Sequence, residues 1–410
     1  MATLGSVVNM DSIDLYSAAA ALHGDGSLMV SPLSILYCSM LLYLGAEERT
    51  KTNLESSFHF DTAFYSDRSA ALSMFSNGLA FFQNATTNTQ DNFLLTSLVN
   101  EIFVADRALN AMNVPVPVTL KSEYQQSINA LHSLAQTKNF LDQPDQSRQE
   151  INAEVARNTA NTTQNLLPEN SVTNITVIVL VNTLYFKGSW LNKFNERATS
   201  KAPFTLLNGS TVQVDMMHQT TSFNYTEDDQ LDIQCVELPF HSFNASMLIL
   251  LPRQSNGLRK LEKALTQQSL QSLGQKATER RVDLSLPKFK FTANYDLVKI
   301  LQAVGVSDVF NRTLADLSGM VNGISIINGV STGSFPRIYV SAGFHQTFIS
   351  VDEKGTEASA ASALVLTSTS SGFNGTPPPP VVFKADHPFL YIIRNNPSKS
   401  VMFMGRVESF

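Results

Sequence analysis

The side chains in this 410-residue chain that could take part in chemistry are seven histidines, two cysteines and many serines, threonines and carboxylates. No histidine lies at ligand spacing from a second histidine or a cysteine, and the sequence contains no His-Glu-x-x-His, Cys-x-x-Cys, P-loop or Gly-x-Gly-x-x-Gly. We therefore expect no metal and no bound cofactor. A dispersed Ser-His-Asp triad stays open, because triads are recognised by geometry rather than by composition. An enzyme is only weakly supported.

The most unusual segment of the chain covers residues 355–380. It consists almost wholly of glycine, alanine, serine, threonine and proline with a few aliphatic residues, and it ends in four consecutive prolines at 377–380. Strand-forming sequence resumes directly with Val381-Val382-Phe383. A long, weakly hydrophobic segment between ordered elements is typical of a functional loop or a flexible linker, and composition alone favours the linker.

The order of residues within this segment favours a strand instead. With Thr356 taken as the first inward-facing residue, the inward set is Thr356, Ala358, Ala360, Ser362, Leu364 and Leu366, which is small and then aliphatic. The only charged residue, Glu357, falls on the outward face. No proline interrupts residues 355–372, so every backbone N–H is available for strand pairing, and Gly355 supplies hinge freedom. We therefore predict a segment that can insert into a sheet.

Composition and charge exclude several function classes. The net charge is -6 without a basic block, which argues against nucleic-acid binding. No stretch reaches the roughly 18 apolar residues that span a bilayer, and the first residues do not form a recognisable cleaved signal. Eight possible N-glycosylation sites, at Asn84, Asn161, Asn174, Asn208, Asn224, Asn244, Asn311 and Asn374, favour a secreted glycoprotein, with the cytoplasm as the alternative.

The remaining sequence predicts a mixed helical and strand fold. Residues 1–165 are interpreted as mostly helical, with Ser31 as an N-cap before Pro32 and with Gly45 closing the helix. Strands are predicted at 176–187, where both faces are apolar, at 281–291, where the pattern alternates, and at 246–251, 389–394 and 401–404. Cys38 and Cys235 are expected to be buried thiols. No repeat or linker divides the chain.

A set of motifs along the chain resembles the serpin family, the serine protease inhibitors. The clearest is residues 351–362, Val-Asp-Glu-Lys-Gly-Thr-Glu-Ala-Ser-Ala-Ala-Ser, which look like the hinge of an inhibitory member, and residues 383–393 resemble the family's C-terminal signature. Further matches, in the family's order, are Ser31-Pro32-Leu33-Ser34, Leu44-Gly45-Ala46, residues 182–190, Met216-Met217, Glu237-Leu238-Pro239, Leu286-Pro287-Lys288-Phe289, Asp316-Leu317-Ser318-Gly319 and residues 403–407. Lys193 and Gln346 depart from the family, which commonly has proline and lysine there.

This resemblance implies an α+β fold, with helices packed around three β-sheets, in a single domain of residues 1–410 with an exposed reactive-centre loop at about 355–380. It implies a suicide-substrate inhibitor: a protease attacks the loop, forms an acyl-enzyme, and is distorted when the loop inserts as a strand. The implied hinge is Glu353, Gly355, Thr356, Glu357, Ala358, Ser359, Ala360, Ala361 and Ser362. The implied sheet-opening clusters are Ser31, Ser34, Asn182 and His345, and Trp190, Lys288 and Glu353.

Two positions are candidates for the cleaved bond. The family's spacing from Glu353 places it at Thr369-Ser370, whereas counting back from Pro388 places it near Pro377, so the loop is longer than usual. Phe373-Asn374 is the second choice, since phenylalanine suits a chymotrypsin-like protease, but it adds about 13 Å of slack at strand rise. No lysine or arginine lies between Lys354 and Lys384, so elastase-like or chymotrypsin-like targets are expected rather than trypsin-like ones.

The expected partners are serine proteases, in covalent 1:1 complexes with a monomeric inhibitor. The alternative is a non-inhibitory serpin of the carrier or chaperone type, although such members usually lose the small-residue hinge that this chain keeps. Heparin binding is doubtful, because Arg68 is the only basic residue in the helical region 61–83.

Overall fold

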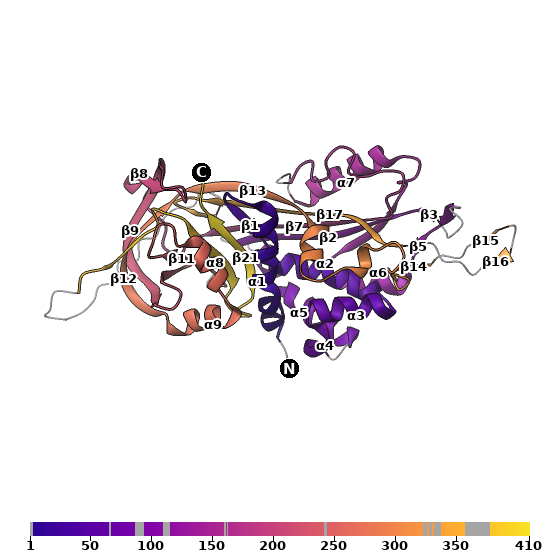
Figure 1. Cartoon of the computed structure of the whole chain (residues 1–410), viewed down its shortest axis with the longest axis horizontal. Helices are drawn as coiled ribbons and strands as arrows, with labels where there is room; N and C mark the ends of the chain where they lie inside the picture. Colours follow the sequence, from indigo (N-terminus) through magenta and orange to yellow (C-terminus); the bar gives the residue numbers. More distant parts are fainter. Residues whose placement is uncertain are drawn as a thin grey trace.

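The computed structural model describes residues 3–64, 67–86, 94–109, 115–159, 161, 163–241, 244–322, 326–327, 330–331, 338–356 and 378–410. These residues form a six-stranded sheet and a nine-stranded sheet, with helices on both faces of the first (Figure 1). The helices are α1 (Leu4–His23), α2 (Pro32–Gly45), α3 (Glu48–Ser57), α4 (Phe60–Phe64), α5 (Arg68–Thr86), α6 (Ser122–Asn129), α7 (Pro144–Asn158), α8 (Leu258–Ala264), α9 (Gln267–Lys276) and α10 (Leu297–Ala303).

The six-stranded sheet is the element that carries the candidate site. Its order is β13 (Phe289–Asp296), β17 (Val340–Val351), β18 (Gly355–Thr356), β7 (Ile178–Ser189), β2 (Leu94–Ala105) and β6 (Leu134–Lys138). Strand β7 is buried along nearly its whole length, as its apolar sequence on both faces predicts. The prediction that residues 1–165 are mostly helical is wrong at β2, a strand of 12 residues paired with β7, because a run rich in apolar residues can form a buried strand as well as a helix.

The nine-stranded sheet combines one strand near the N-terminus with strands from residues 200–407. Its order is β1 (Leu28–Val30), β21 (Val401–Val407), β20 (Phe389–Asn395), β11 (Ala245–Pro252), β10 (Ile233–Pro239), β9 (Thr211–Asp228), β12 (Thr278–Pro287) and β19 (Val381–Lys384), with β8 (Ser200–Thr205) also paired to β9. The strand predicted at 281–291 is divided at Lys288 into β12 and β13, which belong to different sheets. The predicted strands at 246–251, 389–394 and 401–404 are confirmed in β11, β20 and β21.

Three short two-stranded pairs complete the described strands. They are β14 (Val321–Asn322) with β5 (Thr119–Leu120), β15 (Ile326–Ile327) with β16 (Val330–Ser331), and β3 (Arg107–Leu109) with β4 (Pro115–Pro117).

Helices α2 and α7 lie on opposite faces of the six-stranded sheet (Figure 1). The Ser31 side chain accepts a hydrogen bond from the Ser34 N–H, Pro32 occupies the first turn, and the helix ends at Gly45, as predicted. All residues of α2 except Leu44 are buried, so this helix forms the central packing layer below the sheet. Cys38 and Cys235 are free and buried, as predicted, and this burial raises the pKa of both thiols to about 12.

Among the described residues, no helix combines the length and the hydropathy that crossing a membrane requires.

Candidate functional site

The candidate site is the end of the six-stranded sheet where β7 and β17 separate. These two strands pair in parallel from Val340 opposite Ile178 to Phe348 opposite Tyr185. Beyond this point β18 lies between them, with Thr356 opposite Val351 of β17 and opposite Gly188 of β7, antiparallel to both. The first residues after the β17 turn are therefore already a strand of the sheet.

Thr356 is held firmly in this position. Its side chain is fully buried, which is the inward orientation that the alternation predicts. The Oγ1 atom accepts a hydrogen bond from the Gly188 N–H at 2.7 Å and lies 3.3 Å from the Gly188 carbonyl oxygen, to which it donates. Both hydrogen-bonding capacities of the hydroxyl are thus used by one residue of β7.

Gly355 is the hinge position where only glycine fits. Its φ is +152°, and a Cβ atom there would lie 2.0 Å from the Gly188 carbonyl oxygen. Any larger residue would clash with backbone rather than with a flexible side chain, so it would push the hinge away from β7.

An ion pair and a tryptophan surround the entrance to this strand. Glu353 is paired with Lys288 at 2.9 Å and accepts a hydrogen bond from the Thr199 hydroxyl at 2.7 Å. The Trp190 indole N–H donates to the Asp352 carbonyl oxygen at 2.9 Å, and its ring stacks on Phe240 with centroids 4.7 Å apart. A hollow of about 260 Å³ borders this cluster and is lined by Glu196, Lys288, Asp352, Glu353 and Lys354.

Charge complementarity holds the Glu353–Lys288 pair in its ionised form. Burial alone would raise the pKa of Glu353, but the hydrogen bonds from Lys288 and Thr199 outweigh it and lower the pKa below the ordinary value. The hydrogen bond to Glu353 in turn raises the pKa of Lys288. The structure thus places Lys288 and Glu353 in direct contact, and the Trp190 indole bonds the neighbouring Asp352.

The second predicted cluster lies deeper, between α2 and the sheet. The Asn182 side chain bonds the Ser34 hydroxyl at 2.9 Å and His345 Nδ1 at 2.5 Å, and the Ser31 N–H donates to His345 Nε2 at 3.3 Å. Because Nε2 accepts, the proton resides on Nδ1 and is donated to Asn182. Burial lowers the pKa of His345 to about 3, so the ring is neutral. The cluster ties α2 to both β7 and β17.

Three contacts in these clusters were not predicted from the sequence. Asn100 of β2 accepts a hydrogen bond from the Asn182 amide. Thr199 supplies the second bond to Glu353, and the Asp352 carboxylate accepts the N–H groups of Lys354 and Gly355 at 2.8 and 3.1 Å. The Asp-x-x-Gly spacing is a turn signal that could have indicated the Asp352 contact, whereas Asn100 and Thr199 stand in no comparable motif.

The part of the loop that carries the cleaved bond lies outside the described residues. These predicted residues are Glu357, Ala358, Ser359, Ala360, Ala361, Ser362, Thr369, Ser370, Phe373 and Asn374. Six sequon asparagines, Asn161, Asn174, Asn208, Asn224, Asn244 and Asn311, are described and exposed. Of the two family departures, Gln346 donates to the Asn294 side chain at 2.5 Å, so its replacement of lysine is accommodated by a hydrogen bond.

The chain contains one Gly-x-Ser-x-Gly run, at residues 329–333. Its Ser331 lies in the short strand β16, paired with β15, whereas a hydrolase nucleophile of this type requires a strand-to-helix turn. Within the described ranges, no group of three or more His, Cys, Asp or Glu side chains could hold a metal ion.

Arg68, the only basic residue of the region 61–83, lies beside Glu47, with 3.0 Å between Nη1 and the carboxylate. Its charge is thus already paired within the protein.

Comparison with known proteins agrees with this geometry. A family model described as Serpin (serine protease inhibitor) matches residues 8–410. Human leukocyte elastase inhibitor is 33% identical over 415 residues, covering 100% of both chains, and human Serpin B3 is 32% identical over 401 residues, covering 94% of each. Uncleaved ovalbumin has a TM-score of 0.83 at 26% identity and covers 100% of both chains. Serpin48 of the insect Tenebrio molitor has a TM-score of 0.81 at 26% identity and covers 99% of this chain and 98% of that one.

These relatives confirm the predicted α+β fold, and those named as inhibitors support protease inhibition rather than an enzymatic activity. The chain belongs to the serpin family of serine protease inhibitors.

Proposed function

We propose that this serpin inhibits serine proteases as a suicide substrate, by loop cleavage, acyl-enzyme trapping and insertion of the loop into the six-stranded sheet. The observation that carries the proposal is β18: Gly355 and Thr356 already occupy the gap between β7 and β17. Insertion then extends an existing strand and does not start a new one. The proposal includes the single domain of residues 1–410 and a monomeric inhibitor in a covalent 1:1 complex.

The register of β18 predicts where each following residue would lie after insertion. Because β18 is antiparallel to β7 and β17, each later loop residue would pair with a residue one position earlier in each of these two strands. Residue 366 would then lie opposite Ile178 and Ser341, at the far ends of β7 and β17. The predicted inward set from Thr356 to Leu366 is therefore as long as the stretch over which β7 and β17 would have to separate. Ser362 falls opposite Asn182 and His345, where its hydroxyl can bond the two polar side chains that it separates.

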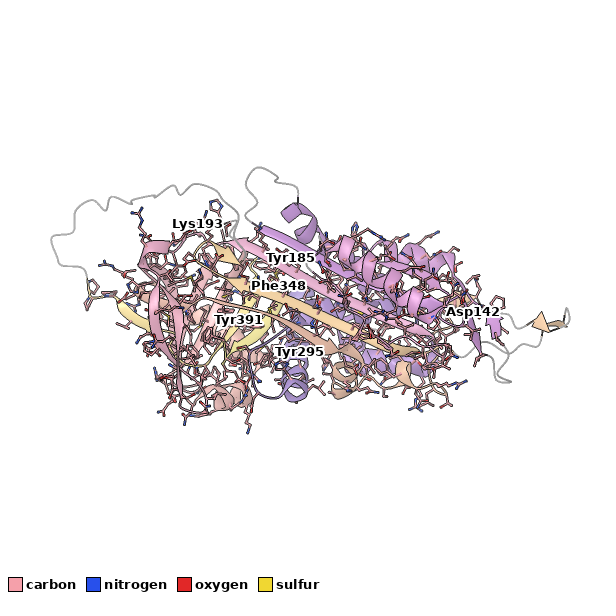
Figure 2. All side chains as sticks on the ribbon, turned by 90° about the horizontal axis from the view of Figure 1, so that it is seen from above. Asp142, Tyr185, Lys193, Tyr295, Phe348 and Tyr391 are labelled. Carbon is pink, nitrogen blue, oxygen red and sulfur yellow. The ribbon has the colours of Figure 1, made fainter. Side chains whose placement is uncertain are left out.

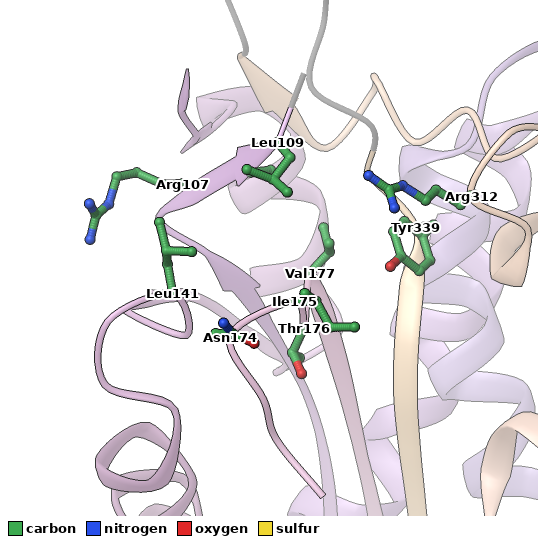
Figure 3. A pocket seen from close by; sticks show the side chains of 10 residues that line it. Arg107, Leu109, Leu141, Asn174, Ile175, Thr176, Val177, Arg312 and Tyr339 are labelled. Atoms are coloured by element: carbon green, nitrogen blue, oxygen red, sulfur yellow. The ribbon is translucent and has the colours of Figure 1, made fainter. Parts of the chain in front are cut away.

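This length also favours Thr369-Ser370 as the cleaved bond. Thr369 lies three residues beyond the end of the gap, or about 10 Å at strand rise, whereas Phe373 lies seven residues beyond it, or about 23 Å. Figure 3 shows the far end of β7 and β17, where Val177 and Tyr339 line a small cavity of about 40 Å³. A shorter tether leaves the trapped protease less freedom there, and a taut tether is what distortion of its active site requires.

The target class follows from loop chemistry and from the relatives. The loop has no lysine or arginine between Lys354 and Lys384, and two of the similar proteins are named leukocyte elastase inhibitor in human and horse. An elastase-like target at Thr369 is the first choice, and a chymotrypsin-like protease that cleaves at Phe373 as a substrate site is the second.

The direct test incubates the purified protein with elastase-like, chymotrypsin-like and trypsin-like proteases. We expect an SDS-resistant 1:1 adduct with the elastase-like enzyme, and mass spectrometry of the denatured C-terminal fragment should show that it begins at Ser370. Thr356→Arg buries an unpaired charge in the gap and should convert the inhibitor into a substrate. Glu357→Arg, on the face that the alternation predicts to be outward, is the matched control and should still form the adduct. A stable adduct with Thr356→Arg would disprove insertion.

The alternative remains a non-inhibitory serpin of the carrier or chaperone type. Thermal denaturation before and after loop cleavage separates the two, because a protein that inserts its loop gains a strand and should unfold at a much higher temperature. An unchanged Tm after cleavage would favour the alternative.

Secretion as a glycoprotein is part of the proposal, with the cytoplasm as the alternative. The six described sequon asparagines are all exposed, so the folded surface allows their modification. A mass decrease after enzymatic removal of N-glycans from protein made in its native cells would support secretion, and an unchanged mass would support the cytoplasm.

A further inference from the structure

Helix α7 and the segment after it cover the path that the inserting strand must take. A hydrophobic cluster joins Ile151 and Val155 of α7 to Phe103 of β2 and to Val179 and Val181 of β7. Ala342 and Phe344 of β17 pack against the same cluster. In the register of β18, residues 363 and 365 would pass between these β7 and β17 positions, directly below the cluster. Figure 1 shows α7 above the strands of the six-stranded sheet.

A carboxylate lies inside this otherwise apolar contact. Glu101 of β2 shares its sheet face with Phe103 and is only 3% exposed. Its Oε1 atom accepts a hydrogen bond from the Asn158 side chain, at the end of α7, at 2.6 Å. Its Oε2 atom is buried and has no hydrogen-bond partner among the described residues. A buried acceptor without a partner costs free energy, and far more so when it is ionised.

The charges around Glu101 do not offset this cost. Glu154 of α7 has the same sign and repels the carboxylate, while Lys138 of β6 and Arg157 of α7 attract it. Lys138 is shared, since its Nζ lies 3.3 Å from Glu150 and 3.9 Å from Glu154. No cation forms an ion pair with Glu101 among the described residues. The contact between α7 and the sheet therefore contains one uncompensated negative charge whenever Glu101 is ionised.

We propose that Glu101 is a positioning residue that weakens the contact of α7 with the sheet when it is ionised, and thereby sets how fast the loop can insert beneath α7. This inference rests on the proposed inhibitory function. It makes Glu101 a determinant of the rate of trapping although the residue touches neither the loop nor the protease.

Burial is the main cause of the raised pKa of Glu101, followed by the charge of Glu154, and together they bring the pKa to about 7. Between the ordinary value of 4.5 and about 7 the native protein binds more protons than the unfolded chain. Native stability from this group is therefore present below about pH 4.5 and is lost as the pH rises through about 7. Asp11, whose pKa burial also raises to about 7, titrates in the same direction, so the test must compare variants and not pH values alone.

The test is Glu101→Gln, which keeps the acceptor for Asn158 and removes the charge. We expect the Tm of the native protein to rise by about 2–4 °C relative to wild type at pH 8 and to rise by less than half of that at pH 5.5, where only part of the penalty has developed. With an elastase-like protease, the stoichiometry of inhibition of the variant, divided by that of wild type, should exceed one at pH 8 and approach one at pH 5.5, because slower insertion lets more acyl-enzyme hydrolyse.

Two further variants keep the result interpretable. Asp145→Asn changes an exposed carboxylate in the first turn of the same helix, paired with Arg148 and not with Lys138, and should show no difference from wild type that depends on pH between 5.5 and 8. Asn158→Ala removes the donor to Glu101 Oε1 and should lower the Tm more at pH 8 than at pH 5.5. This variant tests the inference even if Glu101→Gln does not fold. A Tm shift of Glu101→Gln that is equal at both pH values would overturn the inference. If wild type forms no adduct at any pH, the proposed function fails instead, while the Tm comparison still tests Glu101.

Discussion

Tyr185 of β7 and Phe348 of β17 lie opposite each other and stack, with ring centroids 6.1 Å apart and an interplanar angle of 23°. They are the last pair in register before the strands part to admit Gly355 and Thr356. Figure 2 labels the two residues at neighbouring places on the sheet. In the register of β18, residue 359 would come between them, so the first step of further insertion is the separation of this aromatic pair.

Phe348→Ala should destabilise the native protein more than the loop-cleaved protein. The stacked pair contributes about 0.5–1.5 kcal/mol beyond its burial, and this contribution exists only while the strands are adjacent. Differential scanning calorimetry of both forms measures the two penalties. Phe291→Ala on β13 is the control, because β13 pairs with β17 on the side away from β7 and insertion between β7 and β17 should leave that pairing unchanged. Equal penalties for Phe348→Ala in both forms would contradict the predicted path.

Gly355→Ala should displace the hinge from the sheet. A Cβ atom at this residue would lie 2.0 Å from the Gly188 carbonyl oxygen, and moving the hinge breaks the bond between Thr356 Oγ1 and the Gly188 N–H. Faster hydrogen exchange of the Gly188 amide reports this loss. Gly209→Ala provides the control, since Gly209 also has a positive φ but no atom lies within 4 Å of its Cβ position. An unchanged exchange rate in Gly355→Ala would show that the hinge tolerates the side chain.

Trp190 should report the state of the hinge in fluorescence, because it is the only tryptophan of the chain and its indole N–H bonds the Asp352 carbonyl oxygen. The lowered pKa of Glu353 means that the ion pair with Lys288 contributes stability above the ordinary value of about 4.5, and that this stability is lost as the pH falls through the lower folded-state pKa. We expect a red shift of the Trp190 emission on acidification. In Glu353→Gln the emission should be red-shifted already at pH 7. If the emission of that variant is not red-shifted and does not change with pH, the environment of Trp190 does not depend on the ion pair.

His345 should make native stability fall with acidification. Its pKa is lowered by burial from 6.5 to about 3, so the unfolded chain binds more protons between these values and native stability is lost as the pH drops below about 6.5. His345→Gln keeps hydrogen-bonding capacity without a titrating group. The stability advantage of wild type over this variant should shrink by about 2 kcal/mol between pH 7.5 and pH 5, as urea unfolding would show. The direction is opposite to that of Glu101, and a constant advantage would mean that His345 is not buried as a neutral ring.

Local patterns predicted the parts of the site that lie close together in the chain. The alternation after Gly355 indicated that Thr356 faces inward, and Ser31-Pro32 indicated the start of α2. The clusters themselves were identified only through the family's motifs, because Trp190, Lys288 and Glu353 lie far apart in the sequence and meet through tertiary packing.

The contacts that sequence reasoning missed have a common physical origin. Asn100 and Glu101 are adjacent on β2, but strand alternation directs them to opposite faces, toward α2 and toward α7. The contacts of either residue can be predicted only when the positions of the helices that cover the two faces are known. The division of residues 281–291 at Lys288 was missed for a similar reason, since the alternating pattern of β12 and β13 is the same whichever sheet they join.

The position of β20 and β21 has a consequence for biosynthesis and for the fate of the cleaved chain. These C-terminal strands are paired between β1, from the first thirty residues, and β11, and their side chains are almost entirely buried. The nine-stranded sheet therefore cannot close until residues 389–407 have left the ribosome. A nick in the loop yields a two-chain molecule whose smaller piece is an interior part of the fold, so gel filtration should show one particle where denaturing electrophoresis shows two.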